Sequence, residues 1–429
     1  MSLKESSFNS AQRFVRSILP YLDNTGSPAH SVVELEKFLK DNFPEAKKLN
    51  RYEKWSLVKG GTYYLYDHNA TMMAFHVGKG YNVENKGIVI AAGHTDSPAL
   101  KLEYKSENVA HAFNQPGVLE ERLIRIEKPI IVVPNLSVHL QTSEERQVLK
   151  LNKEKHLRGV VATEAVHNLH SNGSHPVLGF IAKELGVKVE DIVDMDLCMF
   201  DITKSSLSGL YEEFLSSARL DNLASCFSVL GGFVDFVKSN GWLLPLITYL
   251  KTDYSNYITC VIFYNYEEMG SLMASGANSD ITIEWIKKIF NSMDSSFEEN
   301  KDRAMVLNVD MSHAVHPNHS ERHSDTHQPH FHEGLVMKRN INGRYATELR
   351  AAAVVIETAR EAGIPIQDFR VPNDSPCGST VGPFLSSRLC VPVVDVGIPQ
   401  LAMHSIREIC STVDMWHLKE VVRVSGSVC

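Results

Sequence analysis

The spacing of apolar and polar residues along the chain alternates between two periods. Residues 8–19, 30–41 and the Ala-rich segment 345–363 place apolar residues at helical spacing, which predicts amphipathic helices. Short apolar runs at 71–78 and 87–94 predict buried strands. The alternation returns in the second half of the chain. It predicts an α/β fold, a mixed sheet covered by helices.

The segment from about residue 99 to 214 breaks this alternation. It contains short strand-like runs, such as "PIIVVP", between charged segments such as "TSEERQVLKLNKEKHLRG". A chain of 429 residues is also too long for one ordinary core. We therefore predict a discontinuous main domain, residues 1–98 and 215–429, with a smaller β-rich domain inserted at 99–214.

Composition narrows the classes of partner. The formal net charge of −8 argues against nucleic acid or an anionic membrane as a partner. The first residues lack the apolar core of a secretory signal, and the apolar runs 87–93 and 243–250 are too short to cross a bilayer. The seven cysteines include no CxxC pair, which suits a reducing compartment. We expect a cytoplasmic protein that binds neither nucleic acid nor membrane.

Two adjacent glutamates follow another apolar run. Residues 260–264 predict a buried strand, and Glu267 and Glu268 lie just beyond it. Successive side chains of a regular strand point in opposite directions, so a strand cannot aim both carboxylates at one spot. The pair must lie where the strand ends, with each acid facing a different partner. A solvated strand end is the alternative, since Glu is mostly exposed.

Other predicted elements also end in polar side chains. His94 and Asp96 follow one strand, Asp310 follows another, His404 follows a third, and Asp221 opens a helix. Ligand sites in open α/β sheets gather outside the carboxyl ends of strands, and His and carboxylates are ligands of divalent metals. The pattern alone leaves other roles open. A His after a strand is often structural, Asp221 could cap its helix, and Asp310 could be a turn residue.

Several short motifs occur in order along nearly the whole chain. They are "GSPAHS" (26–31), "AGHTDSP" (92–98), "ARLDN" (218–222), "EEMGS" (267–271), "DMSHAVHPN" (310–318), "VMKRNINGRYAT" (336–347), "GSTVGP" (378–383) and "PQLAMHSIRE" (399–408). Together they resemble the aspartyl aminopeptidase family, the dinuclear zinc aminopeptidases of peptidase family M18, clan MH. The resemblance implies an enzyme that removes N-terminal Asp or Glu from peptides.

The resemblance also implies a ligand set for two Zn²⁺ ions per subunit, with Co²⁺ or Mn²⁺ as exchangeable alternatives. His94 would bind one metal and His404 the other, and Asp221 would bridge the two. Asp310 would complete the set of the first metal and Glu268 that of the second.

The remaining acids then receive separate roles. Asp96 would orient a ligand, and Glu267 would be the general base that takes a proton from the water shared by the metals. The water attacks the first peptide carbonyl of a substrate with a free α-amino group, and the proton passes to the leaving amine. This division explains why the two neighbouring glutamates need different directions.

Substrate residues follow from the same resemblance. Lys338 and Tyr345 match positions that hold an acidic substrate side chain, although a solvated lysine is the ordinary alternative. His313 belongs to a tract of seven histidines at 313–332 and would serve the active-site wall or a subunit contact. The segment 378–383 lacks the Lys-Ser/Thr of a P-loop and is expected to shape the substrate pocket.

The chain departs from the family pattern in two places. Asn265 and Tyr266 precede the glutamates where the family has Asp-Asn or Asp-His. After about residue 103, a Gly- and aromatic-rich stretch ending in a Trp-Phe-Asp-Arg-Asp-Leu run is missing.

The resemblance also implies a homododecamer, with the inserted domain expected to act in dimerisation or as a lid. The loss therefore places that assembly in doubt. Two alternatives stay open: an aminopeptidase of broad or neutral specificity, and a weakly active or inactive assembly or cargo protein.

Overall fold

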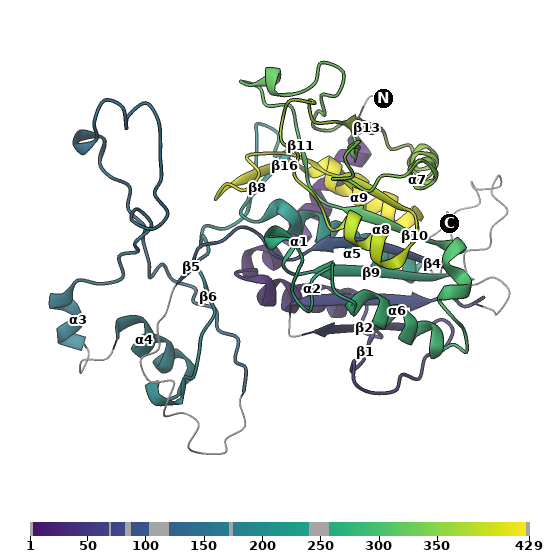
Figure 1. Cartoon of the computed structure of the whole chain (residues 1–429), viewed down its shortest axis with the longest axis horizontal. Helices are drawn as coiled ribbons and strands as arrows, with labels where there is room; N and C mark the ends of the chain where they lie inside the picture. The colour runs from purple at the N-terminus through teal and green to yellow at the C-terminus, as the bar shows by residue number, and fades with distance from the viewer. Residues whose placement is uncertain are drawn as a thin grey trace. The chain divides into compact units, whose positions relative to one another are not determined.

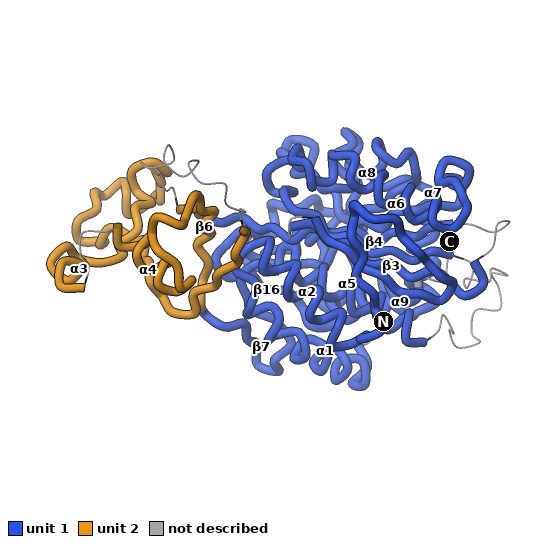
Figure 2. The backbone as a smooth tube through the Cα atoms, turned by 90° about the horizontal axis from the view of Figure 1, so that it is seen from below, with its two compact units in different colours: residues 1–99, 203–429 blue, residues 100–202 orange. Residues whose placement is uncertain are grey.

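The chain folds into two units. The computed structural model describes residues 3–67, 70–81, 87–102, 120–170, 175–239 and 257–425. Unit 1 comprises Met1–Ala99 with Thr203–Cys429, and unit 2 comprises Leu100–Ile202 (Figure 2). The first boundary lies within one residue of the predicted one. The second lies earlier, because strands at 206–208 and 214–217 pair within unit 1.

Unit 1 is built on a nine-stranded sheet of order β1-β2-β3-β9-β4-β10-β14-β12-β13. In chain order, its strands are β1 (Lys47–Lys48), β2 (Thr62–Asp67), β3 (Thr71–Val77), β4 (Ile88–His94), β9 (Ile258–Tyr264), β10 (Ala304–Val309), β12 (Leu335–Lys338), β13 (Ile366–Phe369) and β14 (Val393–Gly397). The central strands β9, β4, β10 and β14 are parallel to their neighbours in that series, whereas β2–β3, β3–β9 and β12–β14 pair antiparallel. The mixed sheet predicted from the sequence is confirmed.

Helices pack on both faces of this sheet (Figure 1). They are α1 (Glu5–Asn24), α2 (Pro28–Asn42), α5 (Leu220–Lys238), α7 (Leu349–Ala362) and α9 (Thr412–Ser425) on one face, and α6 (Ile281–Asn291) and α8 (Gly382–Leu389) on the other. The alternation along β9 separates the two cores: Val261 and Phe263 join the first, whereas Ile262 and Tyr264 join the second. Burial on both faces explains why the strands read as continuous apolar runs.

A second, five-stranded sheet has the order β11-β15-β16-β8-β7. Its strands are β7 (Ser206–Ser208), β8 (Phe214–Ser217), β11 (Ser312–His313), β15 (Pro399–Leu401) and β16 (Glu408–Ser411). Strand β8 leads into α5, and the loop between β15 and β16 carries His404. Short 3₁₀ turns of unit 1 are η5 (Glu267–Met269), η6 (Glu298–Arg303) and η7 (Ser320–Arg322). This sheet therefore delivers two predicted ligands to the end of the larger one.

Helix α5 is the central helix of unit 1. Its length and composition alone would allow it to cross a membrane, but 94% of its apolar window is buried inside the fold. Buried core helices of globular proteins can have the same length and apolar composition. The expectation that no apolar run spans a bilayer concerned two runs. Residues 88–93 of the first lie in β4, and the second, 243–250, lies outside the described residues.

The described part of unit 2 contains little regular structure. Its elements are β5 (Lys101–Leu102), paired with β6 (Leu197–Cys198), the helices α3 (Glu164–His170) and α4 (Pro176–Leu185), and the 3₁₀ turns η2 (Val138–Leu140) and η3 (Val189–Asp191). The strand-like run "PIIVVP" contributes a bridge between Val132 and Val160, and Val132 is 60% exposed. The described residues of unit 2 hold less strand than the sequence predicts: among them, the run pairs only through this single bridge. The sequence departs from the family pattern after about residue 103. Residues 103–119, which include most of this segment, lie outside the described residues.

Candidate metal and active site

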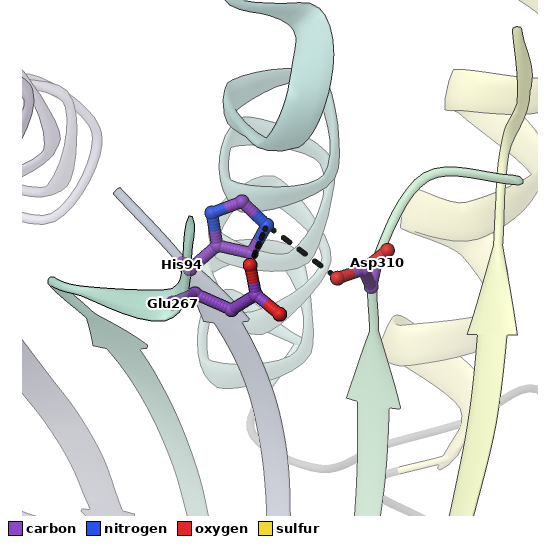
Figure 3. A group of neighbouring side chains, drawn as sticks. All are labelled: His94, Glu267 and Asp310. Atoms are coloured by element: carbon purple, nitrogen blue, oxygen red, sulfur yellow. Dashed lines mark ion pairs between the residues drawn. The ribbon is translucent and has the colours of Figure 1, made fainter. Parts of the chain in front are cut away.

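The carboxyl ends of three adjacent parallel strands bring the first predicted site residues together. His94 is the last residue of β4, Asp310 follows β10, and Glu267 follows β9 in the turn η5. Figure 3 shows one ring nitrogen of His94 facing the carboxylates of both Glu267 and Asp310. The Nε2 atom of His94 lies 3.4 Å from Asp310 Oδ2 and 3.9 Å from Glu267 Oε2. The convergence expected at this edge of the sheet is therefore present.

Asp221 lies between the two predicted histidine ligands. Its Oδ1 atom is 3.4 Å from His94 Nε2, and its Oδ2 atom is 3.1 Å from His404 Nε2. The backbone of Asp221 is not helical, with φ −81° and ψ 104°, although it lies within the bounds of α5. Its carboxylate thus faces the two histidines instead of capping the helix. Each histidine meets a different oxygen of the same side chain.

Asp96 fixes the glutamate pair through the backbone. Its Oδ1 atom accepts a hydrogen bond from the N–H of Glu267, and its Oδ2 atom accepts one from the N–H of Glu268, both at 3.1 Å. The pair lies in a turn between Tyr266, with φ 68°, and Gly270, with φ 90°. Glu267 therefore reaches the His94 side of the cluster, whereas Glu268 Oε1 lies 3.0 Å from the Nε2 of His404.

The same aspartate sets the orientation of His94. The Nδ1 atom of His94 lies 2.9 Å from the backbone oxygen of Asp96, to which it can donate a hydrogen bond. This contact leaves Nε2 free to face the carboxylates, the arrangement that histidine ligands of metals commonly show. Asp96 thus positions three of the predicted site residues and is itself only 6% exposed.

Burial and crowding shift the pKa values of the cluster. Burial raises the pKa of Glu267 to about 8; His94 opposes this shift and Asp310 adds to it. Hydrogen bonds to Asp221 and Glu268 raise the pKa of His404 to about 10. Burial acts to raise the pKa of Asp221, but its interactions with His404 and His94 outweigh this effect and lower that pKa. Neighbouring carboxylates repel one another and lose hydration when they are buried. Nearby positive charge offsets this free-energy cost.

The donor atoms of the cluster fit a divalent metal ion. Two groups, His94 with Glu267 and Asp310, and His94 with Asp221 and Glu268, place their ligand atoms within 4.8 Å of one another. Asp221 Oδ1 is buried and has no hydrogen-bond partner in the described chain. Imidazole nitrogen and carboxylate oxygen are the donors that Zn²⁺ accepts. The first group also places the predicted general base beside the predicted ligands.

Lys338 lies at the edge of this cluster. Its side chain is buried at the end of β12, and its Nζ donates to Asp310 Oδ1 at 2.5 Å. The same Nζ lies 5.4 Å from the centre of the Tyr345 ring, so the two predicted substrate residues are neighbours. His313, on β11, remains exposed, yet desolvation and the charge of Lys338 lower its pKa. Lys338 thus contacts the predicted ligand Asp310, Tyr345 lies beside Lys338, and the charge of Lys338 acts on His313.

Asp395 ties the substrate segment to the sheet. This buried carboxylate on β14 accepts hydrogen bonds from Asn308 Nδ2, Thr380 Oγ1 and the backbone N–H of Ala346, each at 2.6 Å. Thr347, next to Ala346, donates from its Oγ1 to the carbonyl of Lys338 at 2.5 Å. The position of Lys338 and the segment 378–383 therefore depend on one buried acid.

The histidine tract does not form a second metal centre in the described chain. Both groups with metal-ligand spacing contain His94, and neither contains a residue of 313–332. His316 and His319 pack with ring centres 5.0 Å apart, and His332 Nδ1 lies 2.8 Å from Ser411 Oγ. These histidines make ordinary packing and hydrogen-bond contacts.

Glu408 is the buried acid that sequence reasoning missed. It is 2% exposed and accepts hydrogen bonds from the backbone N–H groups of Asp221, at 3.0 Å, and His404, at 2.7 Å. Burial raises its pKa to about 7, against the effect of these hydrogen bonds. The available signal was a glutamate at the start of β16, at the end of the motif that contains His404.

Comparisons with known proteins agree with this architecture. A family model described as aminopeptidase I zinc metalloprotease (M18) matches residues 21–120 and 113–423. An aspartyl aminopeptidase of Caenorhabditis elegans is 34% identical over 450 aligned residues, covering 94% of this chain and 92% of the relative. The solved structure of the Ape4 and Nbr1 complex aligns with a TM-score of 0.86 at 27% identity, covering 99% of this chain and 87% of that one. The mApe1 dodecamer of Saccharomyces cerevisiae has the same fold, with a TM-score of 0.75 at 22% identity, covering 98% of this chain and 97% of that one.

The alignments agree that this chain lacks residues that relatives have. The 450 aligned positions exceed the 429 residues of the chain, so the nematode relative carries residues that this chain lacks. The family match is divided near residues 113–120, close to where the sequence departs from the family pattern.

Proposed function

Because the chain belongs to the M18 family of zinc aminopeptidases, we propose that it is a dinuclear zinc enzyme that removes N-terminal Asp and Glu from peptides. That the chain is a metalloaminopeptidase follows from the family itself. The finer proposal rests on one observation: His94 and His404 face opposite oxygens of Asp221, with Asp310 and Glu268 beside them.

In this proposal, the five residues of that arrangement hold two Zn²⁺ ions, for which Co²⁺ or Mn²⁺ could substitute. His94 and Asp310 serve one ion, His404 and Glu268 serve the other, and Asp221 serves both. Bound zinc supplies a Lewis acid and lowers the pKa of a bound water to near neutrality. The ligands come from the end of β4, the residue after β10, the start of α5, the turn η5 and the loop between β15 and β16, and the fold brings them together.

The proton is handled by Glu267. Its backbone is fixed by Asp96, and its carboxylate lies on the His94 side of the cluster without being needed as a ligand. It accepts the proton of the water that attacks the first peptide carbonyl and gives it to the amine that leaves. A carboxylate placed in this way typically contributes about 10²–10⁴-fold to the rate.

Preference for acidic N-terminal residues is assigned to Lys338 and Tyr345, with His313 on the same wall. The nematode relative's name, aspartyl aminopeptidase, supports this assignment. One observation favours the alternative of broad or neutral specificity: Lys338 already has an internal partner in Asp310, 2.5 Å away. A preference for Leu over Asp substrates would support that alternative.

Assembly and location complete the proposal. The yeast neighbour is a dodecamer, which supports a homo-oligomer for this chain, with unit 2 acting in dimerisation or as a lid. The residues missing relative to the nematode enzyme keep open a weakly active assembly or cargo protein. The six described cysteines are free thiols, which supports a cytoplasmic location.

The proposal is tested with the purified chain. It is assayed against N-terminal Asp, Glu, Leu and Lys amides, with and without added zinc, cobalt or manganese. Metal-dependent hydrolysis of the Asp and Glu amides is expected. No hydrolysis of any amide with any metal, from a folded protein, would support the inactive alternative.

A further inference from the structure

Glu408 lies where two ligand-bearing segments meet. It is the first residue of β16, and its register partner on the antiparallel strand β8 is Ser217. Strand β8 continues within four residues to Asp221, while β15 and β16 are joined by the loop that contains His404. The topology therefore brings one buried acid next to both segments.

Each oxygen of Glu408 binds a different segment. Oε2 accepts from the N–H of Asp221 at 3.0 Å, and Oε1 accepts from the N–H of His404 at 2.7 Å. The side chain is 2% exposed, so water does not compete for these contacts. The carboxylate spans the gap between two residues that are 183 positions apart in the chain.

Both segments have backbone conformations that need support. Arg219 has φ 61°, and in the other segment Ala402 has φ 58° and His404 φ 64°. L-residues seldom adopt this left-handed region, and such residues persist where surrounding contacts hold them. Hydrogen bonds from the adjoining N–H groups to one buried carboxylate provide such contacts.

We propose that Glu408 is a positioning residue that holds Asp221 and His404 at the separation required to bind one zinc ion between them. This inference rests on the proposed dinuclear site. It assigns Glu408 no contact with metal or substrate. Asp96 uses the same device on the other side of the cluster, where its two oxygens hold the N–H groups of Glu267 and Glu268.

A purely structural role is the competing explanation, and the chain offers a matched control. Asp414 is also fully buried, and it accepts hydrogen bonds from the N–H groups of His332, at 2.7 Å, and Gly334, at 2.9 Å. Neither of those residues is a proposed metal ligand. Glu408→Gln and Asp414→Asn each convert one acceptor oxygen of such a bridge into a donor.

The test is a zinc titration of the full-length metal-free protein against a chromophoric chelator, with thermal unfolding of the same metal-free samples. Glu408→Gln should weaken the affinity of one of two zinc ions by about 10- to 100-fold, the usual effect of losing a group that orients a metal ligand. Asp414→Asn should keep both affinities at wild-type values, even where it lowers the melting temperature. If Glu408→Gln does not fold, Glu408→Asp, which keeps the charge but shortens the reach, is held to the same criterion.

The outcomes separate the two proposals. Two zinc ions bound equally well by wild type and the Glu408 variant would overturn the positioning role and leave the dinuclear site intact. Equal losses of zinc affinity in the Glu408 and Asp414 variants would also overturn it, in favour of general destabilisation. A wild-type protein that binds fewer than two zinc ions would overturn the dinuclear site, and the inference with it.

Discussion

The ammonium group of Lys338 lies 2.5 Å from the carboxylate of Asp310, and both side chains are buried. The contact links a residue proposed to select substrates with a residue proposed to bind metal. A buried charge-assisted hydrogen bond contributes about 1.5–3 kcal/mol. Lys338 therefore contacts a proposed metal ligand directly, and in the proposed function it also binds an acidic substrate side chain.

Replacing Lys338 tests the specificity. Lys338→Leu should lose about 10- to 150-fold in kcat/KM on Asp and Glu amides, the range that corresponds to one buried charge-assisted contact. Hydrolysis of the Leu amide should fall much less, and it serves as the control within the same preparation. An equal loss on all amides would show a general role for Lys338 at the metal centre.

The adjacent glutamates should differ in what they lose. Glu267→Gln should retain zinc and the wild-type melting temperature, while kcat falls by at least about 10²–10⁴-fold because the base is removed. Glu268→Gln, its matched neighbour, should instead weaken zinc binding. Measuring kcat and zinc content for both variants checks the assignment. Near-normal turnover by zinc-loaded Glu267→Gln would show that another group takes the proton.

Two glycines of the segment 378–383 should respond differently to the same change. A Cβ on Gly382 would lie 2.5 Å from Asp395 Oδ2, whereas a Cβ on Gly378 would meet nothing within 4 Å. Gly382→Ala should therefore destabilise the fold by about 1–3 kcal/mol, the usual cost of overpacking a core. Gly378→Ala should be nearly neutral. Urea unfolding of both variants provides the comparison, and similar stabilities would mean that Asp395 can move away at little cost.

The shorter chain should also assemble differently. Symmetric assemblies need every contact patch on every subunit, and strands without neighbours expose pairing edges. We expect dimers or a mixture of species with low activity. Light scattering on the purified chain measures this directly. A single active species of about twelve subunits would show that the missing stretch is dispensable.

The sequence predicted the parts of this molecule that depend on local pattern. Apolar runs marked β4, β9 and β10, and the polar residues that follow them meet because parallel strands end at one edge. The need for Glu267 and Glu268 to face different partners also followed from strand geometry. Their different directions come from a turn that Asp96 holds through the backbone.

Other features depend on contacts between distant segments, which pattern does not encode. Glu408 acts on backbone N–H groups of residues that the topology alone brings near it. Asn265, which replaces an acid of the family pattern, accepts a hydrogen bond from the N–H of Tyr266 at 2.7 Å and so stabilises the turn. The end of the inserted unit was misplaced because the pairing of β7 with β8, and of β8 with β16, cannot be read from the apolar spacing.

We propose that one shared aspartate and two histidines organise a dinuclear zinc centre for aminopeptidase chemistry. The most direct measurement is the zinc content per chain during stepwise reconstitution of the metal-free protein, followed in parallel with hydrolysis of the N-terminal Asp amide. We expect saturation at two zinc ions per chain, with full activity reached only at the second, and at most one tightly bound ion in Asp221→Asn. Full activity with one zinc ion per chain, or two tightly bound ions in Asp221→Asn, would contradict it.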